Sequence, residues 1–240
     1  MPEVTAMPDE RARLIVALDV ADADAARELV DAIGDGASFY KVGLELVMAG
    51  GLPLVEELRD QGRMVFLDVK LLDIGNTVER SVARAAETGA NLLTIHGVDR
   101  KTVAAAAAGR GDSDMKILGV TVLTNLNVDD VADQKIETPI PDLVLHRAKL
   151  TVSAGGDGVV ASALEASAVR AAIGSEALVV TPGIRLADDA LGDQTRVATP
   201  ASAIQAGASH IVVGRPITQA DDPRAAAERF QEAIAAALSS

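Results

Sequence analysis

The chain has 240 residues, enough to bury the core of one large domain, and its net charge is −13. Lysine and arginine are scattered singly and only 2% of the residues are aromatic, which argues against binding to nucleic acids or anionic membranes. The absence of cysteine excludes disulfides, thiolate nucleophiles and sulfur-ligated metals. No apolar run is long enough to span a bilayer, and residues 1–13 contain no signal-peptide core, so we expect a soluble, cytoplasmic protein.

Short apolar runs alternate with amphipathic stretches along the chain. The runs predict strands at residues 14–20, 38–46, 64–71, 91–97, 116–123, 157–163, 177–184 and 210–217. The stretches between them predict helices at residues 22–33, 53–61, 76–88, 99–108, 141–154, 164–173, 200–206 and 223–238. Eight strand-helix units without a linker predict a single-domain (β/α)₈ TIM barrel over residues 1–240, with residues 1–13 as an N-terminal extension. An open doubly wound sheet is the alternative, but no G-x-G-x-x-G motif follows the first strand.

The third predicted strand and the turn after it carry an unusual set of polar residues. Asp68 and Lys70 are two positions apart in an apolar strand, so their side chains should point to the same face. Asp73 follows the strand, and Thr77 lies four residues later at the start of a helix. A lone buried ion pair would be explained as structural. A second carboxylate within reach of the same ammonium favours an active site instead.

Two further charged residues fall at the same end of the predicted barrel, where chemistry is usually located. Asp19 ends the first strand, although it could instead cap the helix that follows. Lys41 lies inside the second strand, where a buried lysine needs a carboxylate partner. The sequence therefore predicts an alternating row of Asp19, Lys41, Asp68, Lys70 and Asp73. Carboxylates beside both lysines favour proton donation by an ammonium group over Schiff-base chemistry.

The sequence gives little support for a metal site. His96 ends the fourth strand, where a histidine more often packs than ligates, and no second histidine falls near it. A magnesium ion held by Asp19, Asp68 and Asp73 remains an alternative, because carboxylate oxygens suit that ion. The lysines among these carboxylates would compete with the metal.

The last third of the chain predicts a phosphate site. Gly183 and Arg185 follow the seventh strand, and Gly214 and Arg215 follow the eighth. Loops after these two strands commonly bind phosphate in such barrels. Glycine allows the backbone to approach closely, and arginine binds phosphate oxygens in a bidentate manner.

These segments together resemble the orotidine 5′-phosphate decarboxylase family. The resemblance lies in LIVALDV at the first strand, YKVGLEL at the second, the D-x-K-x-x-D-I-x-x-T pattern of FLDVKLLDIGNTV, VTVLT, VTPGIR and the block from DQTR to GRPIT. It covers essentially the whole chain. It implies decarboxylation of orotidine 5′-monophosphate (OMP) to UMP in de novo pyrimidine synthesis, without metal or cofactor.

The resemblance also implies roles for individual residues. Lys70 donates a proton to C6, Asp68 lies beside the departing carboxylate, and Lys41 with Asp19 orders the network and meets the ribose. The remaining residues of the implied substrate site are Thr124 at the pyrimidine edge, Pro182 near the base, and Arg185, Gln194, Gly214 and Arg215 at the phosphate.

In this family Asp73 and Thr77 cross a homodimer interface to complete the partner's site. The nearest alternative is a magnesium-dependent sugar-phosphate lyase similar to 3-hexulose-6-phosphate synthase, which shares D-x-K-x-x-D. Ile74 and Thr77, which continue the pattern, and Lys41 favour the decarboxylase. A non-catalytic phosphate-binding protein is a third hypothesis, disfavoured by the intact pair of Asp68 and Lys70.

Overall fold

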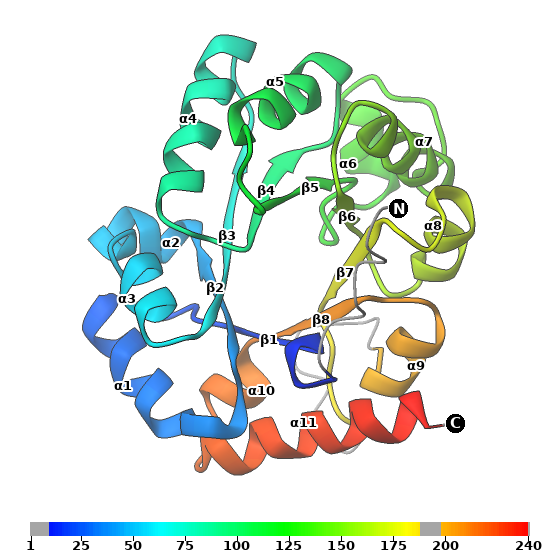
Figure 1. Ribbon diagram of the computed structural model, residues 1–240. Coiled ribbons are helices and arrows are strands. Elements are labelled where there is room, and N and C mark those ends of the chain that lie inside the picture. Colours follow the sequence, from blue (N-terminus) through cyan, green and yellow to red (C-terminus); the bar gives the residue numbers. More distant parts are fainter. Residues whose placement is uncertain (1–9, 188–197, 240) are drawn as a thin grey trace, which may run out of the picture.

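The computed structural model describes residues 10–187 and 198–239, and it shows a closed barrel of eight parallel strands in sequence order (Figure 1). The strands are β1 (Leu14–Ala17), β2 (Phe39–Gly43), β3 (Met64–Leu71), β4 (Leu92–His96), β5 (Lys116–Val120), β6 (Gly158–Val160), β7 (Leu178–Pro182) and β8 (His210–Val213). Each strand pairs with the next, and β8 pairs with β1 to close the barrel. The predicted fold class is therefore confirmed.

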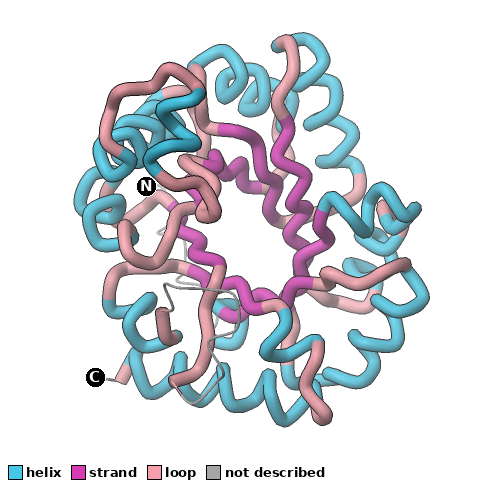
Figure 2. The backbone as a smooth tube through the Cα atoms, turned by 180° about the vertical axis from the view of Figure 1, so that it is seen from behind, coloured by secondary structure: helices cyan, strands magenta, loops and turns pink. Residues whose placement is uncertain are grey.

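Helices surround the ring of strands on its outer side (Figure 2). They are α1 (Ala23–Ile33), α2 (Leu44–Leu46), α3 (Leu54–Asp60), α4 (Gly75–Glu87), α5 (Arg100–Arg110), α6 (Val128–Asp133), α7 (Ile140–Ser153), α8 (Ala166–Ile173), α9 (Pro200–Gln205), α10 (Arg215–Thr218) and α11 (Pro223–Leu238). Short helical turns occur at η1 (Glu10–Arg13), η2 (Gly34–Gly36) and η3 (Val47–Gly51). Within the described ranges, no helix has both the length and the apolar character needed to cross a membrane.

The strands bury apolar side chains on both faces, as expected for a parallel sheet covered by helices. Outward-facing residues such as Leu14 and Val16 belong to the large core shared with the helices. Alternate positions point inward and fill the barrel. The inward set is Ile15, Ala17, Phe39, Phe66, Leu92, Leu118, Val180 and Val212. The barrel interior is therefore a packed core beneath the site.

Seven of the eight predicted strands are too long at their carboxyl ends, whereas the third has the predicted bounds, residues 64–71. The eighth was expected at residues 210–217, but it ends at Val213 because Pro216 has no N–H for the ladder and lies in α10. The prediction also missed α6. Its signal is Asn127 followed three residues later by Asp130, which form a reciprocal capping box at the helix start.

A buried histidine lies at the end of the barrel opposite the carboxyl ends of the strands. His210 begins β8 and is 4% exposed. Its ring meets that of Phe39 edge to face, with the ring centroids 5.7 Å apart. Burial lowers the pKa of His210 to about 4, and the positive charge of Arg13 acts in the same direction. The fold therefore holds this imidazole in its neutral form.

The free energy of unfolding should fall as the pH decreases from 6.5 to 4. In this window the unfolded chain binds a proton at His210 that the folded chain does not, because the folded pKa is the lower one. Between pH 7 and pH 5 we expect a loss of about 2 kcal/mol, measured by urea denaturation. The variant His210→Gln should lack this loss, and an equal loss in both proteins would contradict the assignment.

Candidate active site

The carboxyl ends of the strands surround a cavity of about 380 Å³, a volume suited to a small-molecule ligand. Most of the residues predicted for the site line it: Asp19, Lys41, Asp68, Lys70, Thr124, Pro182, Arg185, Gly214 and Arg215. Two predicted residues, Asp73 and Thr77, do not line this cavity. Gln194 lies outside the described residues. The structure thus gathers residues from six of the strand ends at one place.

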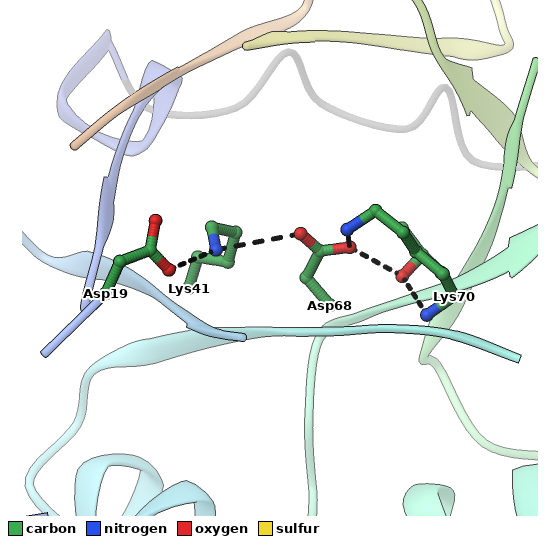
Figure 3. Close-up of polar contacts among 5 residues, drawn as sticks. Asp19, Lys41, Asp68 and Lys70 are labelled. Atoms are coloured by element: carbon green, nitrogen blue, oxygen red, sulfur yellow. Dashed lines mark hydrogen bonds and ion pairs between the residues drawn. The ribbon is translucent and has the colours of Figure 1, made fainter. Parts of the chain in front are cut away.

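Four charged side chains form a continuous row at the cavity (Figure 3). Lys41 Nζ lies 2.8 Å from Asp19 Oδ1 and 3.6 Å from Asp68 Oδ2. Lys70 Nζ lies 2.7 Å from Asp68 Oδ1. The side chain of Lys41 is 10% exposed and that of Asp68 is 12% exposed, whereas that of Lys70 is 34% exposed. Lys70 is therefore the more accessible of the two ammonium groups.

Asp68 is ionised in spite of its burial. Burial by itself would raise the pKa of this carboxyl group, because it disfavours the charged form. The charges of Lys41 and Lys70 and hydrogen bonds from Lys70 and Thr94 outweigh burial and hold the pKa of Asp68 below its ordinary value. The cavity thus contains a fixed negative charge between two cations.

The backbone at Lys70 departs from regular strand geometry. Its φ angle is 48°, in the left-handed region that residues other than glycine seldom adopt. The pairing between β3 and β4 shifts register at the same point, between Leu67 and Leu71. Regular alternation predicts that Asp68 and Lys70 share a face, but it does not predict this distortion. Strained backbone of this kind clusters at functional sites.

Sequence reasoning missed a fifth participant in the network, Thr94 on β4. This side chain is fully buried, and its hydroxyl contacts both Lys70 and Asp68. The available signal was a threonine inside an apolar strand, two positions before His96 and therefore on the same face.

Sequence reasoning also missed Gly43, the last residue of β2. A β-carbon placed there would lie 2.9 Å from Lys41 Nζ and 3.1 Å from Asp19 Oδ1. Both contacts are shorter than normal van der Waals contacts. The absence of a side chain at Gly43 therefore leaves the space in which Lys41 reaches Asp19.

The opposite side of the cavity carries arginines after β7 and β8. The backbone N–H of Arg185 donates to the carbonyl of Ala198 at 3.1 Å, which joins the two ends of the loop after β7. Gly214 and Arg215 lie where β8 passes into α10. Among the described residues of the cavity wall, the cations are Lys41, Lys70, Arg185 and Arg215 and the anions are Asp19 and Asp68. The wall is therefore net positive and suited to an anion, although the whole chain is strongly negative.

Between the charged row and the arginines, the cavity wall is largely apolar. Phe66 and Val212 extend the barrel core up to the cavity. Val120, Val122, Leu123 and Val160 add an aliphatic surface beside Thr124. This combination can hold a flat, weakly polar ring and present its edge to a few polar groups.

The expectation that Asp73 lies within reach of Lys70 in the same chain is wrong. Asp73 is exposed in the turn before α4, where its carboxylate accepts the N–H of Ile74 at 2.6 Å, and it forms no ion pair within the described residues. Thr77 lies in the first turns of α4, in a separate surface depression with Arg80 and Arg84. The turn geometry separates Asp73 and Thr77 from the cavity.

Among the described residues, no group of three or more histidine, aspartate or glutamate side chains is arranged to hold a metal ion.

Asp19 does not cap α1, because Asp22 is the N-cap and its carboxylate accepts the N–H of Ala25. His96 ends β4 but is not part of the cavity wall. Burial lowers the pKa of His96, and the charges of Lys70 and Arg147 add to this effect.

Comparisons with known proteins identify the family. Residues 12–230 match the sequence model of the orotidine 5′-phosphate decarboxylase / HUMPS family. The chain belongs to this family. It is 51% identical over 230 residues to orotidine 5′-phosphate decarboxylase of Rhodopseudomonas palustris (strain BisB5), which covers 96% of this chain and 97% of the relative. It is 53% identical to the enzyme of the same name from Methylorubrum extorquens (strain PA1), with coverage of 96% and 97%.

A solved structure from the family has the same fold. The crystal structure of orotidine 5′-phosphate decarboxylase from Lactobacillus acidophilus superposes with a TM-score of 0.82 at 36% sequence identity. The alignment covers 93% of this chain and 99% of the crystallised chain. The barrel of this chain is thus shared with that crystal structure.

Substitution Gly43→Ala should displace Lys41. The backbone angles at Gly43 (φ −89°, ψ 172°) are open to alanine, so the chain should fold, with a loss of about 1–3 kcal/mol from overpacking. In a crystal structure of the variant, Lys41 Nζ should lie more than ~3.5 Å from Asp19 Oδ1, beyond hydrogen-bonding distance. Gly36→Ala, another buried glycine with close neighbours but far from the cavity, is the control. An unchanged Lys41 position in Gly43→Ala would contradict the prediction.

Proposed function

We propose that this protein decarboxylates OMP to UMP and CO₂, the last step of de novo pyrimidine synthesis. The observation that carries the proposal is the Lys70 ammonium, held 2.7 Å from Asp68 beside a partly apolar cavity whose far side is cationic. Membership of the family and the names of its close relatives support the same reaction. The protein is then a carboxy-lyase.

The reaction requires charge stabilisation at one ring carbon. Loss of CO₂ from C6 leaves an electron pair that no adjacent carbonyl group can accept, so the barrier is high. Lys70 places a cation beside this carbon as the negative charge develops and then gives it a proton. Asp68 keeps Lys70 oriented and lies beside the substrate carboxylate, which it repels. The apolar wall strengthens these interactions because it excludes water.

The rest of the nucleotide is bound at a distance from the reacting carbon. Thr124 meets the pyrimidine edge, Pro182 packs near the base, and Lys41 with Asp19 meets the ribose. The phosphate is held by Arg185, Gln194, Gly214 and Arg215. Binding energy from a remote phosphate can order loops over the cavity and so contribute to the rate.

We propose that the reaction uses neither metal nor cofactor. The alternative, a magnesium-dependent enzyme similar to 3-hexulose-6-phosphate synthase, would need carboxylates free to ligate the ion. Lys41 occupies the space between Asp19 and Asp68, with its ammonium paired to both. Asp73 is exposed in the turn before α4 and is not available to complete a three-carboxylate set in this chain.

We further propose that the protein is a cytoplasmic homodimer in which Asp73 and Thr77 reach the partner's cavity. Both residues follow β3 and lie outside the cavity of their own chain. Large apolar side chains are exposed in the segments that follow β2 and β3, and they suit burial between subunits: Leu44, Met48, Leu52, Leu72 and Ile74.

The reaction is tested by the loss of absorbance when the purified protein meets OMP in the presence of EDTA. The wild type should convert OMP, and Lys70→Ala should lower kcat at least about a thousandfold, because both the cation and the proton donor are lost. Binding of UMP, measured by calorimetry, should stay within about tenfold, since the phosphate contacts are intact.

The control is Lys149→Ala, which removes an exposed lysine near the end of α7 and should leave kcat unchanged. Activity that is abolished by EDTA and restored by magnesium would favour the sugar-phosphate lyase. A near-normal kcat in Lys70→Ala would contradict the role of Lys70.

Shared active sites predict complementation between two inactive variants. Asp73→Asn and Lys70→Ala should each be almost inactive alone. After subunit exchange, a hybrid dimer has one site with both changes and one site with neither. Because half of the dimers are hybrids, the mixture should regain about a quarter of wild-type activity. If native mass spectrometry shows hybrids but activity does not return, the two residues do not act across subunits.

A further inference from the structure

The pairing between β3 and β4 is interrupted where the network lies. Leu67 pairs with Leu93 and Leu71 pairs with Ile95. Residues 68–70 of β3 are therefore opposed by Thr94 alone. In such a bulge the extra residues lose their regular ladder hydrogen bonds, and other groups must satisfy them.

The hydroxyl of Thr94 takes over this function. It accepts the backbone N–H of Lys70 at 3.0 Å and donates to Asp68 Oδ1 at 2.8 Å. A threonine hydroxyl has one proton to donate and lone pairs to accept, so both contacts are compatible at the same time. Thr94 is fully buried, and water does not compete for either bond.

These bonds form a closed loop through Lys70. Its backbone N–H binds Thr94, Thr94 binds Asp68 Oδ1, and the same oxygen accepts the Lys70 ammonium at 2.7 Å. The left-handed backbone of Lys70, with φ 48°, costs free energy and needs such support. One hydroxyl thus fixes both the backbone and the charged end of Lys70.

We infer that Thr94 is a positioning residue for the decarboxylation, which holds Lys70 and Asp68 in their reactive arrangement without touching the substrate. Thr94 is not part of the cavity wall, so its effect is exerted through these two side chains. The inference rests on the proposed function and adds a residue to it. It implies that loss of the hydroxyl impairs the chemical step more than nucleotide binding.

The test compares Thr94→Val, which removes the hydroxyl at nearly constant volume, with Thr94→Ser, which keeps it. In Thr94→Val we expect kcat for OMP to fall about 10- to 100-fold, as for loss of a hydrogen bond to a charged group, with KM changed less than about threefold. The hydrogen bond from Thr94 lowers the pKa of Asp68, so its loss should raise that pKa. The acid limb of the pH profile of kcat should therefore move to higher pH. Thr94→Ser should retain most of kcat and the wild-type pH profile.

The matched control is Thr181→Val on β7. Thr181 is also fully buried, and its hydroxyl lies 3.5 Å from the carbonyl of His210, outside the charged network. The Thr181→Val variant should have a lower free energy of unfolding than the wild type, without a change in the pH profile of kcat. If Thr94→Val does not fold, Thr94→Cys, with a weaker donor of similar size, should give the same fall in kcat and the same shift of the acid limb.

Two results would overturn the inference. One is a Thr94→Val enzyme, or its Thr94→Cys substitute, with kcat within about threefold of wild type and an unmoved acid limb. The other is a Thr94→Ser enzyme as impaired as Thr94→Val, since the hydroxyl would then not be the cause. If the proposed function itself is wrong, the wild-type protein will not convert OMP, which distinguishes that outcome from these two.

Discussion

A carboxylate buried between two ammonium groups is the interaction on which the site depends. Removing Asp68 from water is unfavourable by several kcal/mol, and only close positive charges and hydrogen bonds can offset this. Lys41 and Lys70 supply the charges and Thr94 a hydrogen bond. Burial of any one of these side chains without its partners would cost free energy, so each depends on the others. The space left at Gly43 and the bulge in β3 accommodate this row.

The sequence predicted the larger features of the molecule because they follow from periodic patterns. Apolar runs at regular spacing specify eight strands, and closure of the barrel then places Asp19, Lys41, Asp68 and Lys70 at one mouth. Alternation along a strand correctly placed Asp68 beside Lys70. The predicted strand ends were less accurate, since the point at which a strand leaves the sheet depends on its neighbours.

The features that the sequence did not predict depend on contacts between strands. The left-handed backbone of Lys70 arises from a register shift between β3 and β4, which periodicity within β3 cannot reveal. The roles of Thr94 and Gly43 are visible only when two strands are placed side by side. The separation of Asp73 from its own cavity is set by the turn after β3, whose geometry is local and irregular. Sequence patterns specify elements well and the contacts between them poorly.

The cavity and the whole chain have opposite charge. The chain carries a net charge of −13, so at long range it repels an anionic ligand. This field is screened over about 8–10 Å at physiological salt, whereas the arginines at the mouth act at contact distance. An anion at the cavity is therefore attracted by the local cations Arg185 and Arg215 more than by long-range steering.

Closure of the barrel by pairing β1 with β8 brings the first and the last strand together at the cavity. Asp19 follows the first strand and Arg215 follows the last, yet both line one cavity. During synthesis on the ribosome the nascent chain therefore has neither a closed sheet nor a complete pocket until β8 has emerged. Until then β1 and β7 present open edges that can pair with other chains. A complete cavity in this architecture thus requires all eight strands, the last as much as the first.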